Sequence, residues 1–119
     1  MKVLLNESVP RALGFNLNGH HVRTAHSQGF SALSNGELMQ AMLDEGFEVL
    51  ITFDQNLPYQ QNEKLPVAVI VLIAPNNRVE TARSFVPQLL ETLSDLEIGQ
   101  LVQAKPVVKI QPVRKSWAH

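Results

Sequence analysis

A continuous apolar run at residues 67–73, with the sequence VAVIVLI, constrains the fold of this chain more than any other feature. A strand of this composition has no polar face, so helices must cover both sides of its sheet, as they do in parallel α/β proteins. Strand-like and helix-like patterns alternate as far as about residue 98, which is typical of βαβ units. The sequence therefore predicts an α/β fold with a mostly parallel central sheet.

The other elements are predicted from apolar spacing and from residues that start or stop helices. One helix is expected from Ser8, and a second after Ser34, which opens an S-x-x-E capping box. A third should cover residues 78–96, with a kink or a break at Pro87, because proline has no N–H to donate. Further strands are expected at residues 3–5, 20–25 and 48–53.

The C-terminal end of the chain follows a different pattern. Residues 1–98 are expected to form one domain, and residues 99–119 a C-terminal extension that packs on the same domain. Within this extension, Leu101-Val102 and residues 107–110 are strand-like and are separated by Pro106. They should form a terminal hairpin or an antiparallel edge. Because apolar edge strands need a pairing partner, a homodimer is a further hypothesis.

Composition narrows the classes of protein that fit. The 119 residues include no cysteine, which excludes disulfides and thiolate metal sites. No stretch has the length of a membrane span and no signal-peptide pattern is present, so the cytoplasm is the expected location. Residues 1–97 hold all 11 acidic residues and six of the ten Lys and Arg, a formal charge of −5, whereas residues 98–119 carry +4. That basic tail is either an ordinary solvated segment or a contact for nucleic-acid phosphates or an acidic partner.

Two of the predicted strands end in polar, acid-bearing turns. Asn6 and Glu7 follow the first strand, and Asp54 follows the third. In open α/β sheets, ligands bind in the crevice outside the carboxyl ends of the strands. Carboxylate and amide oxygens are the ligands that hard cations such as Mg²⁺ and Mn²⁺ prefer. The sequence therefore predicts a cation site at this edge of the sheet.

Each of these residues also has a purely structural interpretation. Asp54 either binds a ligand or caps the next turn, since Asp side chains bond nearby backbone N–H groups. Glu37 either joins the metal site or, as the third residue of the capping box, bonds the N-cap backbone. Asn6 and Glu7 should point in opposite directions, so only one of them is expected to face the crevice. The amide-rich loop at residues 56–62 either bonds to itself or presents donors to phosphate or bases.

In combination, these segments resemble one known family. They are LLNESVP at residues 4–10, GHHVRT at 19–24, NGEL at 35–38 and TFDQNLPYQQN at 52–62. Their content and order resemble the DUF5615 PIN-like family, related to the Mut7-C domain, over about residues 1–98. The resemblance implies a PIN-like three-layer α/β/α sandwich around a parallel sheet. It also implies a Mg²⁺- or Mn²⁺-dependent ribonuclease, of the kind that often acts as a toxin beside a small antitoxin protein.

The resemblance assigns the catalytic and metal-binding positions to Asn6, Glu37 and Asp54. Asn6 stands where the family usually has Asp, so this site lacks one of its carboxylates. In such hydrolyses the carboxylates hold the ion that activates water. The substitution should therefore weaken metal affinity, and turnover is expected to be low or lost. Additional candidates are Glu7, Asn35 and Asn56, and the residues assigned to substrate binding are Arg11, Tyr59 and Gln60.

Three functions stand as hypotheses. The first is a metal-dependent ribonuclease with a weakened active site, and the second is a catalytically inactive PIN-like module that binds a partner. The third is a receiver-like phosphoacceptor at Asp54, which Lys105-Pro106 late in the chain would also fit. Against it, Ile73-Ala74 stand where a receiver ends its fourth strand with Thr or Ser. Asn6→Asp separates the first two, because it should raise metal-dependent activity only where the rest of the site is intact.

Overall fold

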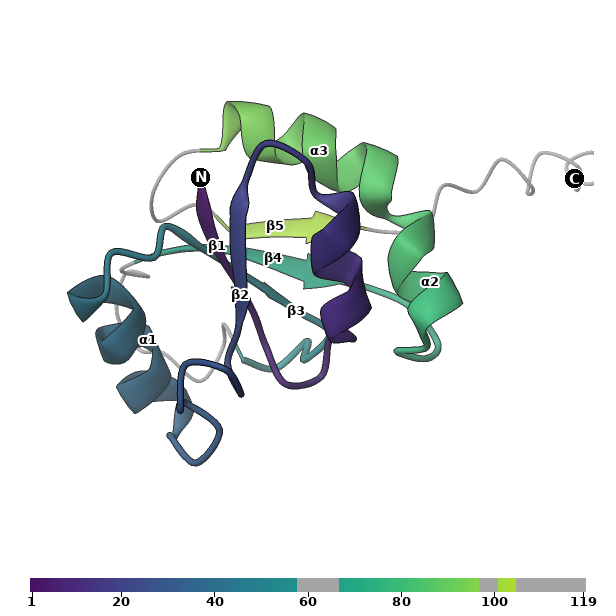
Figure 1. Cartoon of the computed structure of the whole chain (residues 1–119). Coiled ribbons are helices and arrows are strands. Elements are labelled where there is room, and N and C mark those ends of the chain that lie inside the picture. The colour runs from purple at the N-terminus through teal and green to yellow at the C-terminus, as the bar shows by residue number, and fades with distance from the viewer. Residues whose placement is uncertain (58–66, 97–100, 105–119) are drawn as a thin grey trace, which may run out of the picture.

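The computed structural model describes residues 1–57 and 67–96, and the backbone of residues 101–104. Its centre is a five-stranded sheet in the order β2-β1-β3-β4-β5, and each neighbouring pair of strands is parallel (Figure 1). The strands are β1 (Lys2–Leu5), β2 (His21–Thr24), β3 (Val49–Thr52), β4 (Ala68–Leu72) and β5 (Leu101–Ala104). The predicted α/β fold around a mostly parallel sheet is confirmed.

Helices cover both faces of this sheet. Figure 1 shows α1 on one side, and the 3₁₀ helix η1 together with α2 and α3 on the other. These helices are η1 (Arg11–Asn16), α1 (Asn35–Asp44), α2 (Val79–Ser84) and α3 (Val86–Asp95). Every residue of β4 is buried, because Ile70 and Leu72 enter the core beneath η1, α2 and α3 while Val69 and Val71 enter the core beneath α1. The apolar run without a polar face therefore has a core on each side, as β1 and β3 also do.

Helix α1 begins at the predicted capping box. The Ser34 N–H donates to Glu37 Oε1 at 2.9 Å, and the Glu37 N–H donates to Ser34 Oγ at 3.3 Å. Its buried side chains, Leu38, Met39 and Met42, pack on the sheet. The helix ends before Gly46, whose φ of 81° is in the left-handed region that glycine adopts without a side-chain clash.

The helix expected across residues 78–96 is divided into α2 and α3, as Pro87 indicated. The two helices meet at Phe85, which ends one and precedes the other. Pro87 lies in the first turn of α3, where a missing N–H is tolerated, but it cannot donate to the carbonyl of Arg83 in α2. The buried Phe85 ring contacts Phe53 edge-on, with ring centroids 6.5 Å apart. That contact places the boundary between α2 and α3 next to Phe53, the residue that follows β3.

Two expectations were wrong. The helix expected from Ser8 is a short 3₁₀ helix from Arg11, because the Ser8 N–H and hydroxyl are bound to the Asn6 side chain and Pro10 has no N–H. Leu101-Val102 belongs to β5, which pairs in parallel with β4 of the same chain and not as an antiparallel edge. A crossover through two helices returns the chain to the starting end of the sheet, which makes the pairing parallel. Residues 107–110 lie outside the described residues.

Candidate functional site

The carboxyl ends of β1 and β3 lie side by side. Leu5 pairs with Ile51 in the sheet register, and the Asn6 N–H continues the pairing by donating to the Ile51 carbonyl at 2.9 Å. Asn6 therefore leaves the sheet beside Thr52, the last residue of β3. The two polar turns singled out in the sequence thus begin at neighbouring strand ends.

Ser8 links these two strand ends. Asn6 Oδ1 accepts hydrogen bonds from the Ser8 N–H at 3.1 Å and from the Ser8 hydroxyl at 2.8 Å. The same hydroxyl oxygen accepts from the Phe53 N–H at 3.1 Å and lies 3.5 Å from Thr52 Oγ1. One small side chain therefore contacts both the residue that follows β1 and the residues that end β3.

Asp54 is held by one hydrogen bond through its backbone and one through its side chain. Its N–H donates to Oγ1 of the fully buried Thr52 at 2.9 Å. Its Oδ1 accepts from the Asn56 N–H at 2.9 Å. This second contact is the turn-capping interaction that the sequence left open as one of two interpretations. Asp54 is half-buried, and the oxygen it would offer to a cation is Oδ2.

The loop after β4 joins the same network. Asn77 Nδ2 donates to the Ser8 carbonyl at 2.9 Å, which brings the end of a third strand to this edge. Ser8, Thr52 and Asn77 were all missed by sequence reasoning. Ser8 and Thr52 lie two residues from Asn6 and Asp54, a spacing typical of side-chain-to-backbone turns, and that signal could have identified them. Asn77 has its partner 69 residues away, so no local pattern reveals it.

Glu37 caps α1 in the structure. Its carboxylate is exposed and accepts from the Ser34 N–H at 2.9 Å. The Ser34 backbone N–H, and after it the Ser34 side chain, hold the pKa of Glu37 below its ordinary value, because both contacts favour the ionised form. Of the two interpretations of Glu37, the geometry shows the structural one. Asn35 is half-buried at the first position of the same helix.

The oxygens at the strand ends suit one hard cation better than two. Asp54 brings one carboxylate, and Asn6 brings an amide oxygen without charge that already accepts two hydrogen bonds. Two-metal sites rely on dense negative charge to hold both ions. Among the residues that the structure describes, no group of three or more His, Cys, Asp or Glu side chains is arranged to hold a metal.

A cavity of about 390 Å³ opens beside Asn6. Its lining includes Asn6, Glu7 and Arg11, so the structure brings one additional candidate, Glu7, and one residue assigned to substrate binding, Arg11, next to the strand-end site. Arg11 is exposed and is the first residue of η1. Asn56 is exposed in the turn after Asp54. Tyr59 and Gln60, the other two residues assigned to substrate binding, lie outside the described residues.

Comparisons with known proteins provide no basis for assigning a function to this chain. A scan of protein-family models and searches of curated proteins and of solved structures found no match to this chain. Within the described ranges, none of the helices has the length and apolar content that a membrane crossing requires. Function must therefore be inferred from the chemistry of the site itself.

Proposed function

We propose that this protein is a PIN-like domain that acts on RNA, with a weakened metal-dependent hydrolytic site at the ends of β1 and β3. The observation that carries this proposal is the Ser8 hydroxyl, which joins Asn6 after β1 to Thr52 before Asp54. It supports one site because it holds both candidate ligands on a single hydrogen-bonded frame. The position also supports it, since open α/β sheets bind ligands at this edge.

Asp54 and Asn6 would hold one Mg²⁺ or Mn²⁺ ion, and Asp54 would supply the negative charge. Such an ion, when bound, lowers the pKa of its water and offsets charge on the phosphate under attack. The chain's own contribution is positioning. The Thr52 hydroxyl accepts from the Asp54 N–H and so orients Asp54, and the Ser8 hydroxyl donates to the Asn6 amide oxygen and so orients Asn6. A single carboxylate predicts weak affinity for the ion and therefore slow turnover.

A second candidate is a PIN-like module without catalysis, which binds RNA or a small antitoxin-like protein. Glu37 in its capping box and Asn6 in its turn favour this function, because both side chains already have structural partners that need no metal. A receiver-like role of Asp54 stays a prediction, and labelling by a small phosphodonor would test it. The cytoplasmic location also stays a prediction from the sequence.

Calorimetric titration with Mn²⁺ distinguishes the first two functions. Asp54→Asn should abolish binding, and Asn6→Asp should tighten it by roughly tenfold or more, because affinity follows the number of charged ligands. Glu37→Gln is the matched control, since Gln preserves a capping box while it removes the charge. Binding by this variant should equal that of the native chain.

Cleavage of a fluorescein-labelled single-stranded RNA completes the test. The Asn6→Asp variant should cleave it faster than the native chain in Mn²⁺ and lose that activity in EDTA. If Glu37→Gln abolished Mn²⁺ binding, Glu37 would be a ligand and its capping role would not be its main one. If the native chain and Asn6→Asp both failed to bind Mn²⁺, the hydrolytic proposal would be refuted and the binding module would stand.

A further inference from the structure

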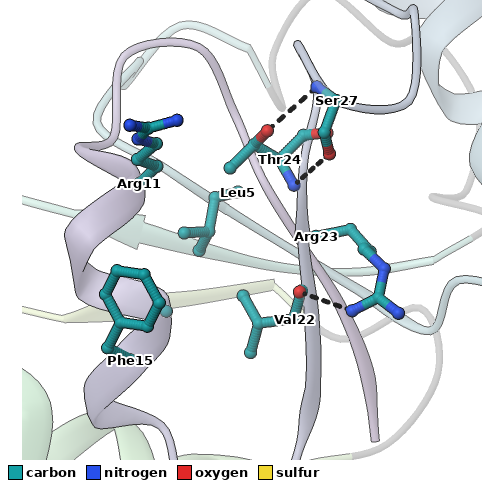
Figure 2. Close-up of a pocket in the computed structure, with 8 residues that line it drawn as sticks. Leu5, Arg11, Phe15, Val22, Arg23, Thr24 and Ser27 are labelled. Atoms are coloured by element: carbon teal, nitrogen blue, oxygen red, sulfur yellow. Dashed lines mark hydrogen bonds between the residues drawn. The ribbon is translucent and has the colours of Figure 1, made fainter.

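A groove runs between η1 and the edge strand β2, next to the strand-end site. Its outer part is a cavity of about 400 Å³, with Leu5, Phe15 and Val22 in its lining (Figure 2). Its inner part is the cavity of about 390 Å³ that reaches Asn6. Arg11, Thr24 and Ser27 line both parts. The two cavities therefore adjoin each other along these three residues, and the second one borders Asn6 of the proposed site.

Phe15 is the most unusual side chain in this groove. It is 82 % exposed, whereas Phe47 and Phe85 are buried. Figure 2 shows its ring on η1, the helix that also carries Arg11. The flat face of an exposed aromatic ring is a surface on which a nucleobase can stack, whatever the base. An aromatic ring beside a groove that leads to a hydrolytic site therefore suggests a binding role.

Positive charge accompanies this ring. Arg11 and Arg23 line the outer cavity, and among the described residues that line the two cavities Glu7, in the inner one, is the single acidic side chain. The Arg23 guanidinium donates to the Val22 carbonyl at 3.0 Å, so Arg11 is the arginine better placed to bind a ligand. Because residues 1–97 carry a net charge of −5, a groove with this lining is locally opposite to its surroundings. Such a groove attracts an anionic ligand.

The backbone of β2 argues against a strand from a second copy as the occupant. β2 lies at the edge of the sheet, where backbone groups are normally open to pairing. Here the Arg23 side chain binds the Val22 carbonyl, and Ser27 Oγ accepts from the Thr24 N–H at 3.2 Å. These contacts occupy backbone groups that an incoming strand would need, whereas the Phe15 ring remains exposed.

We propose that the groove between η1 and β2 binds single-stranded RNA, with a base stacked on Phe15 and a phosphate bound by Arg11. This assignment rests on the proposed function for its choice of RNA, and it adds the path along which the strand reaches the site. The half-buried Val22 offers an apolar contact beside Phe15, and Arg11 lines both parts of the groove. Proteins that bind single strands combine such aromatic faces with cations.

Fluorescence anisotropy with a 5′-fluorescein-labelled oligouridylate decamer, in EDTA, tests this proposal apart from metal binding. Phe15→Ala should weaken binding by roughly 5- to 100-fold, the range expected for loss of one stacked base. Phe15→Tyr keeps an aromatic face and should bind like the native chain. Arg11→Ala should weaken binding and lower the slope of log K against log salt by about one, the signature of one lost phosphate contact.

Three controls make the result decisive. Leu43→Ala removes the exposed apolar side chain of α1, Arg83→Ala removes a cation of α2, and neither residue lines the groove, so both variants should bind like the native chain. The third control is the EDTA itself: without metal the anisotropy assay reports on the groove alone, and the Mn²⁺ titrations report on the strand-end site, so the two proposals fail or succeed separately. Unchanged affinity in Phe15→Ala and Arg11→Ala would overturn the proposal. So would a dimer of the native chain that Phe15→Ala dissociates without any effect on RNA binding.

Discussion

The Ser8 hydroxyl links the two halves of the strand-end site, which the sequence placed at Asn6 and Asp54. It donates to Asn6 Oδ1 and accepts from the Phe53 N–H, and both contacts are partly buried. A partly buried N–H that loses its partner costs more than the partner's net contribution, because the group is not fully returned to water. The geometry of the site therefore depends on a residue without charge.

Ser8→Ala is expected to lower the free energy of unfolding by about 1–3 kcal/mol, because the Phe53 N–H and Asn6 Oδ1 both lose their shared partner. Urea denaturation followed by circular dichroism measures this loss. Ser94→Ala is the matched control: the exposed Ser94 hydroxyl donates to the Glu91 carbonyl within α3, so its loss should stay within about 0.5 kcal/mol. Equal losses in the two variants would contradict the linking role of Ser8.

Glu37 should make stability depend on pH in the acid range. Its pKa is lowered in the folded chain by the Ser34 N–H and hydroxyl, so the unfolded chain binds the proton more readily. The contribution of Glu37 is therefore present above the ordinary value of 4.5 and is lost as pH falls below it. Urea midpoints measured from about pH 6 to about pH 3 should fall less steeply in Glu37→Gln than in the native chain. Identical slopes would show that the carboxylate is not held by Ser34.

At the scale of the element, one glycine inside α1 and one just after it offer the same substitution with opposite outcomes. A methyl group would meet open space at both Gly36 and Gly46, but only Gly46 has a positive φ, 81°. Gly46→Ala should destabilise the chain by about 1–2 kcal/mol, because an L side chain disfavours that conformation. Gly36→Ala should stabilise it by about 0.4–1 kcal/mol, because the unfolded chain loses freedom. Thermal unfolding of both variants tests the pair, and a loss of stability in Gly36→Ala would contradict the assigned start of α1.

Local signals explain which elements could be predicted from the sequence. The capping box at Ser34, the apolar run that contains β4 and the break at Pro87 each depend on neighbouring residues, and all three are found in the structure. The 3₁₀ form of η1 depends on the turn in which Asn6 holds Ser8, which competes with an α-helical start. The parallel pairing of β5 depends on where α2 and α3 return the chain, and no local pattern carries that information.

The candidate site was predicted less fully, for a physical reason. Asn6 and Asp54 were found because polar residues that end apolar runs are visible in any sequence. Their connection through Ser8 and Thr52 requires β1 to lie beside β3, and that neighbour relation exists only in the folded sheet. The Asn77 contact likewise spans from the end of β4 to the end of β1. The polar residues of a site built across strands can therefore be recognised from the sequence, but the hydrogen bonds that connect them cannot.

At the scale of the molecule, the two edges of the sheet differ. On one edge, side chains of Arg23 and Ser27 bind the backbone of β2 itself. On the other edge, β5 pairs along β4, all of whose residues are buried. β4 carries the most continuous apolar run of the chain, so an uncovered β4 edge would be a template for pairing with other chains. β5 therefore protects the molecule as well as completing its sheet.

A chain ended after Leu96 is expected to aggregate, because the backbone edge of β4 would lose its partner while its apolar side chains keep a high strand propensity. A chain ended after Ala104 is the matched control, since it retains all five strands. Light scattering on a size-exclusion column, at equal concentrations, measures the mass of both. Large species only in the shorter chain would show that β5 covers a vulnerable edge. If the shorter chain eluted as a folded monomer, β4 would tolerate exposure, and the domain would be complete without the strand that the sequence placed in a C-terminal extension.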